Sequence, residues 1–91
     1  MNYYFWDLGN QSAGAFVVVS LEGNAANVRL MDSANYRSFQ RGERYQFFGG
    51  LCTQSPVKLQ VPVHSHWFVV VDYGGYAGRG RAAVEVLRAA S

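Results

Sequence analysis

The feature that most constrains the fold of this chain is a two-residue alternation of apolar and polar side chains. Residues 56–62 read PVKLQVP, so the alternation runs between two prolines, and residues 82–86 (AAVEV) repeat it more weakly. Successive side chains of a strand point to opposite faces of a sheet, whereas a helix repeats every 3.6 residues. Both segments are therefore predicted to be strands with one face in a core.

Two other segments lack the alternation and are rich in β-branched residues. Residues 15–19 (AFVVV) and 67–71 (WFVVV) are continuous apolar runs, which indicate central strands covered on both faces. Further strands are expected near residues 3–7, 27–31 and 44–48, about seven in all. Strands at this spacing, separated by turns, predict an all-β fold: an antiparallel β-sandwich of jelly-roll or Greek-key type.

Glycine-rich breaks separate these segments. Gly9-Asn10, residues 22–24, Gly49-Gly50 and residues 73–78 predict tight turns, because glycine adopts positive φ angles without steric cost. Residues 32–42 break the β pattern. They combine an acidic N-cap residue, Tyr36 and Phe39 three positions apart, and a glycine stop, so we expect at most one short helix near residues 33–41.

The chain is long enough for one core only, so residues 1–91 are predicted to form a single β-sandwich domain. Its 49% hydrophobic content excludes intrinsic disorder. The alternation assigns eleven side chains to the core and leaves Lys58, Gln60 and Glu85 outside. The predicted core residues are Val17, Val19, Val28, Leu30, Val57, Leu59, Val61, Val69, Val71, Val84 and Val86.

The location predicted for the domain is cytoplasmic, without membrane contact. Cys52 is the only cysteine and cannot form an intramolecular disulfide. The N-terminus lacks the basic and apolar regions of a secretion signal, and no apolar run approaches the ~20 residues of a membrane span.

Residue patterns for catalysis and metal binding are weak. On a strand, His64 and His66 would point to the same side and could share a cation, but the sequence offers no third ligand. A hairpin turn after Pro62, leading into the strand that starts at Trp67, is favoured, so no metal site is expected. Cys52 has no supporting nucleophile motif, and no G-x-S-x-G is present. Asp72 ends an apolar strand just before Gly74, where an Asx-type turn is favoured over a place in a pocket. We therefore expect no enzyme and no cofactor.

The basic residues are more informative. Seven of the eight are arginines, which bind carboxylates or phosphates bidentately and stack on aromatic rings. Arg79 and Arg81 lie among glycines and tyrosines at residues 73–81. Arg37 and Arg41 lie one turn apart in the expected helix. A solvated rim of arginines is the simpler interpretation. As a hypothesis, the partner-binding residues are Arg37, Arg41, Tyr73, Tyr76, Arg79 and Arg81.

Several runs resemble an uncharacterised family of small bacterial domains. They are residues 21–32 (LEGNAANVRLMD), Gly49-Gly50 and residues 66–76 (HWFVVVDYGGY), and the resemblance covers nearly the whole chain. It implies a β-sandwich-like domain of unknown function that in some proteins accompanies a TIR domain. The family defines no catalytic or binding residue, so none is carried over.

The function predicted is therefore that of a non-catalytic binding or sensing module of unknown ligand. A protein or a small anionic ligand is the favoured partner. Two alternatives stay open. One is a structural or homo-oligomerisation domain that uses surplus aromatic residues at 3–6 and 47–48, and the other is a weak nucleic-acid binder that uses the Arg and Tyr loops.

Overall fold

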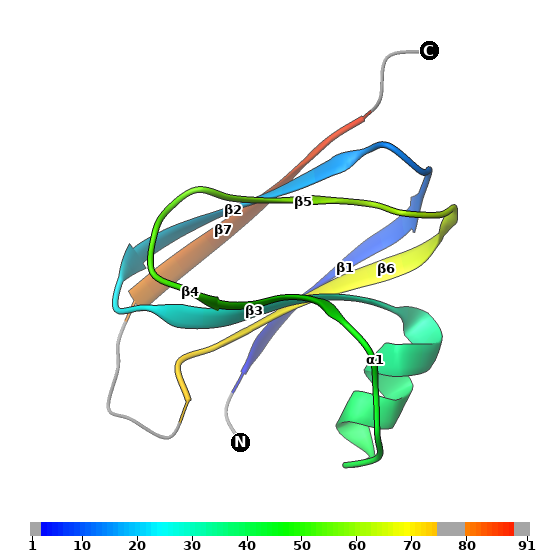
Figure 1. Cartoon of the computed structure of the whole chain (residues 1–91), viewed down its shortest axis with the longest axis horizontal. Helices are drawn as coiled ribbons and strands as arrows, with labels where there is room; N and C mark the ends of the chain where they lie inside the picture. Colours follow the sequence, from blue (N-terminus) through cyan, green and yellow to red (C-terminus); the bar gives the residue numbers. More distant parts are fainter. Residues whose placement is uncertain (1–2, 75–79, 89–91) are drawn as a thin grey trace.

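The computed structural model describes residues 3–74 and 80–88, which form seven strands and one helix (Figure 1). In chain order the elements are β1 (Tyr4–Gln11), β2 (Phe16–Gly23), β3 (Ala26–Asp32), α1 (Ser33–Gln40), β4 (Phe48–Cys52), β5 (Val57–Gln60), β6 (Ser65–Asp72) and β7 (Gly80–Leu87). Every strand pair is antiparallel. The all-β prediction with one short helix is confirmed.

The strands form two sheets that face each other. The four-stranded sheet has the order β1-β6-β3-β4, and the three-stranded sheet has the order β5-β2-β7. Apart from β3 and β4, all neighbouring strands are non-consecutive, and the chain crosses repeatedly from one sheet to the other. Crossing connections of this kind are typical of Greek-key and jelly-roll sandwiches.

The main core lies between the sheets, at the positions that the alternation assigned to it. Seven of the predicted residues are buried: Val17, Val19, Val28, Leu30, Val61, Val69 and Val71. The other four, Val57, Leu59, Val84 and Val86, are half-buried at the rim of the same cluster. Lys58, Gln60 and Glu85 are exposed, so the predicted register of both alternating strands is right.

A second apolar cluster covers the outer face of the four-stranded sheet. Met31 and Val70 of the sheet are buried there against Tyr36 of α1, and the ring of Tyr36 stacks on Phe68 with 4.2 Å between centroids. Because of this cluster β6 is covered on both faces, as its continuous apolar run predicted. The same prediction is wrong for β2, whose outer residues Phe16 and Ser20 are exposed and whose Val18 is only half-buried.

The helix begins and ends where its capping residues predict. The Asp32 side chain accepts from the backbone N–H of Asn35 at 2.9 Å. At the other end Gly42 has a φ of 71°, and the N–H groups of Gly42 and Glu43 donate to the carbonyls of Phe39 and Ser38. These two bonds form a Schellman motif, which requires the left-handed residue that glycine supplies.

Two predicted boundaries are wrong. The strand expected near residues 44–48 begins only at Phe48, and Gly49-Gly50, predicted as a turn, lies inside it. Gly9, predicted in a turn, lies inside β1, where the register with β6 shifts between Asp7 and Gly9. Among the described residues no helix is long and apolar enough to cross a membrane.

Candidate ligand-binding groove

An aromatic groove lies at the end of the sandwich where β3 passes into α1. Its volume is about 590 Å³. Three connections that are distant in the sequence meet there: the β3–α1 corner, the segment between α1 and β4, and the turn between β5 and β6 (Figure 1). The described lining residues are Met31, Asp32, Asn35, Tyr45, Gln46, Phe47, Phe48, Pro62, Val63 and Trp67.

The floor of the groove is rigid and apolar. Met31 and Trp67 are 1% and 3% exposed, so both side chains are held by the packing around them. The indole Nε1–H of Trp67 donates to the backbone carbonyl of Val63 at 3.1 Å, which fixes the ring against the β5–β6 turn. Phe48 lies 6.2 Å from Trp67 between centroids and is 50% exposed. An entering ligand would therefore meet the exposed ring of Phe48 above a packed floor.

The side-chain amide of Asn35 connects one wall of the groove to the start of α1 by hydrogen bonds. The Nδ2–H of Asn35 donates to Asp32 Oδ1 at 2.9 Å, and Asn35 Oδ1 accepts from the backbone N–H of Gln46 at 2.8 Å. Asn35 thus connects the helix N-terminus to the segment that leads into β4. The edge-to-face contact of Phe39 and Tyr45, at 5.1 Å, holds the same segment from the other side.

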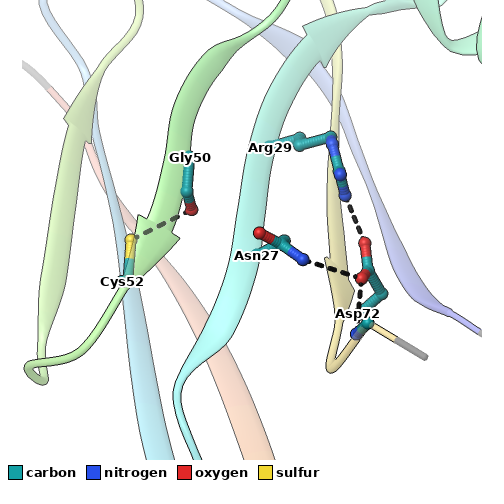
Figure 2. Close-up of polar contacts among 6 residues, drawn as sticks. Asn27, Arg29, Gly50, Cys52 and Asp72 are labelled. Atoms are coloured by element: carbon teal, nitrogen blue, oxygen red, sulfur yellow. Dashed lines mark hydrogen bonds and ion pairs between the residues drawn. The ribbon is translucent and has the colours of Figure 1, made fainter. Parts of the chain in front are cut away.

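A buried polar network lies on the outer face of the four-stranded sheet, between β3 and β6. Asp72, at the end of β6, is 2% exposed; it accepts from Asn27 Nδ2 at 3.0 Å and forms an ion pair with Arg29 (Figure 2). It also accepts from the backbone N–H of Gly74 at 2.9 Å, so the predicted Asx-type turn is present. The guanidinium of Arg29 lies 5.5 Å from the ring centroid of Phe47.

The ionisation of Asp72 follows from these contacts. Burial by itself raises the pKa of this carboxyl, but hydrogen bonds from Asn27, Arg29 and Gly74 and the positive charge of Arg29 outweigh it and hold the pKa below the ordinary value of 3.8. Asp72 is a partnered structural carboxylate rather than a pocket residue.

The family is settled by comparison with family models. The model for a domain of unknown function, DUF1883, matches residues 1–90. The chain belongs to the DUF1883 family. The match confirms the resemblance to an uncharacterised small domain. Neither the curated proteins nor the solved structures contain a match to the chain.

The six residues predicted to bind a partner are not gathered at the groove of this DUF1883 domain. Arg37 is exposed on α1, and Arg41 is exposed at the C-cap that follows it. Tyr73 follows the last residue of β6, and Arg81 lies near the start of β7, at the other end of the sandwich (Figure 1). Tyr76 and Arg79 lie outside the described residues. The four described members therefore form two separate groups, and the structure does not bring them onto one face.

Tyr73, one of the residues predicted to bind a partner, has a packing role in the fold. It is half-buried and packs against the main core, and burial raises the pKa of its hydroxyl. A Cβ built on Gly80 would lie 2.7 Å from that hydroxyl, so Tyr73 fills the space beside the start of β7. The sequence pattern of tyrosine among glycines could not distinguish this packing from a ligand contact.

His66 and Cys52 lie at opposite ends of the four-stranded sheet. His66, predicted in a turn, is in β6, and its Nε2 lies 2.5 Å from Asp7 Oδ1. Cys52 is opposite Ala26 at the start of β3, at the other end of the sheet, and burial raises the pKa of its thiol. Its Sγ lies 3.4 Å from the carbonyl of Gly50 (Figure 2). The described residues contain no group of three metal-ligating side chains.

Sequence reasoning missed the groove. Phe47 and Phe48 were recognised as surplus aromatics, but Trp67 was interpreted as the start of a strand and Val63 was not singled out. Surplus aromatic residues were the only available signal, because the groove is assembled from three separate segments, residues 31–35, 45–48 and 62–67.

Proposed function

We propose that this domain is a non-catalytic binding module that holds a small, largely apolar ligand in the aromatic groove. The observation that carries the proposal is a floor made by nearly buried Trp67 and Met31 beneath exposed Phe47, Phe48 and Val63. Its volume of about 590 Å³ is within the range of small-molecule sites, which runs from roughly 300 to 1,000 Å³.

The chemistry of the lining supports binding rather than catalysis. Asp32 and Tyr45 are the only titratable side chains among its described residues, and Asp32 already caps α1. General acid–base or nucleophilic catalysis needs a second group in hydrogen-bond reach of the first. We also place the module in the cytoplasm of a bacterial cell, as the cysteine content and the resemblance of the sequence suggested.

A neutral fluorescent probe tests the proposal. N-phenyl-1-naphthylamine is apolar and uncharged, and its emission should rise on binding with a stoichiometry of one per chain. Val63 is 58% exposed at the groove, so Val63→Asp should weaken binding about tenfold or more by placing a charge on an apolar surface, without disturbing the core.

The matched control is Leu87→Asp, which places the same charge on an apolar residue that is 45% exposed on the other sheet. This variant should bind the probe like the original chain. Equal affinities of both variants, or several weak sites per chain, would show that the probe is not bound in the groove and would contradict the proposal.

Self-association is the second candidate function. Tyr4 and Phe5 are 60% and 54% exposed on β1, which is an edge strand of the four-stranded sheet. However, Asp7 and the register shift beside it interrupt the second half of this edge, and charges and bulges on edge strands oppose pairing with another chain. The groove is therefore preferred as the functional surface.

A further inference from the structure

We propose that the ligand of the groove is a small organic cation with a methylated ammonium group. This inference rests on the proposed binding function and adds the charge and chemical class of the ligand. It follows from two properties of the lining, the aromatic rings and the single carboxylate, which together are the chemistry that recognises methylated ammonium ions.

The aromatic rings supply the first part of the site. Tyr45 and Phe48 come from the segment that leads into β4, and Trp67 comes from β6. Phe48 is exposed and Tyr45 half-buried at the groove, whereas Trp67 lies nearly buried in its floor. The negative potential on the face of an aromatic ring attracts cations, and methyl groups on the cation add apolar contact area. Phe47 already has one cation near its ring, the Arg29 guanidinium at 5.5 Å, and that charge is paired with Asp72.

The carboxylate supplies the second part. Asp32 is the only residue with a full charge among the described lining residues, and the lining contains no described arginine, lysine or histidine. Both hydrogen bonds that Asp32 accepts from Asn35 reach Oδ1. An anion in the groove would face this negative charge without a cation to balance it. The groove is thus complementary to a cation and not to the small anionic ligand that the arginine content suggested.

A pair of isosteric probes separates charge from shape. Choline carries a trimethylammonium group, and 3,3-dimethylbutan-1-ol has the same shape with a neutral carbon in place of the nitrogen. Both are titrated while the indole N–H resonances are followed by NMR. Trp67 lies in the groove and should shift, whereas Trp6 packs on the core from β1 and serves as an internal control. Choline should bind at least about fivefold more tightly than the alcohol.

The decisive variant is Asp32→Asn, which removes the charge and keeps a side chain suited to the N-cap. It should remove most of the preference for choline, and Glu85→Gln, which neutralises an exposed acid on β7, should leave the preference unchanged. Phe48→Leu is the second variant, because it keeps an apolar surface and removes a ring face. It should weaken choline binding more than binding of the alcohol.

The outcomes separate this inference from the proposed function. Equal binding of both probes to the original chain would overturn the cation inference and leave an apolar groove intact. A preference for choline that survives both Asp32→Asn and Phe48→Leu would also overturn it. If neither these probes nor N-phenyl-1-naphthylamine binds at Trp67, the proposed function itself fails.

Discussion

At the scale of single residues, Asp72 carries the most deeply buried charge of the described chain. Its three partners come from three positions: Asn27 and Arg29 on β3, and Gly74 just after β6. Arg29 is itself only 15% exposed. An ion pair withdrawn from water gains little net stability, but the loss of one partner leaves the other as an uncompensated buried charge. We therefore expect the pair to contribute to the alignment of β3 and β6 more than to the net stability of the sandwich.

Asp72→Asn should lower the free energy of unfolding by about 3 kcal/mol, because Arg29 then stays charged in a nearly buried place. Replacement of both members, Arg29→Met with Asp72→Leu, should cost far less. The folded-state pKa of Asp72 is lowered, so its stabilising contribution is full above the unfolded pKa of about 3.9 and is lost as the pH falls below it. Urea unfolding between pH 2 and 7 measures how the free energy of unfolding depends on pH. An Asp72→Asn variant with the same acid dependence as the original chain would contradict the assignment.

At the scale of elements, predictions from local signals were accurate and those that depended on a neighbouring strand were not. The caps of α1 act within a few residues, so Asp32 and Gly42 could be identified from the sequence. Gly49-Gly50 has the composition of a turn, but its surroundings are set by β3. A Cβ built on Gly49 would lie 2.2 Å from the carbonyl oxygen of Val28, so glycine serves close approach of two strands here.

Gly49→Ala should therefore destabilise the domain far more than Gly50→Ala. Both residues have positive φ angles, 119° and 145°, so both variants share the backbone strain. Only Gly49 meets a backbone atom; a Cβ at Gly50 has nothing within 4 Å. We expect a difference of at least about 2 kcal/mol in urea unfolding, which is typical of steric overlap in a packed strand pair. Similar losses in the two variants would show that β4 moves away from β3 at little cost.

At the scale of the whole molecule, the two sheets share one core although the chain builds them from alternating strands. Period-two patterning predicted which side chains face inward, because that pattern depends only on the strand itself. It did not predict which strands are neighbours. The pairing of Arg29 with Asp72 spans 43 residues, and the groove joins Met31, Phe48 and Trp67. Such contacts are decided by topology, which no local signal encodes.

The shared core predicts that the domain unfolds as one unit. Both tryptophans, Trp6 and Trp67, belong to the four-stranded sheet, whereas Val17 is fully buried on β2 of the other sheet and packs in the same cluster. Val17→Ala removes two methyl groups from that cluster and should cost about 2 kcal/mol. Tryptophan fluorescence and far-UV circular dichroism should report the same lowered midpoint, because a small domain with one core melts cooperatively.

Val18→Ala, on the half-buried outer face of the same strand, is the control and should cost much less. If Val17→Ala shifts the dichroism transition and leaves the fluorescence transition in place, the two sheets unfold separately and the single-domain prediction is wrong.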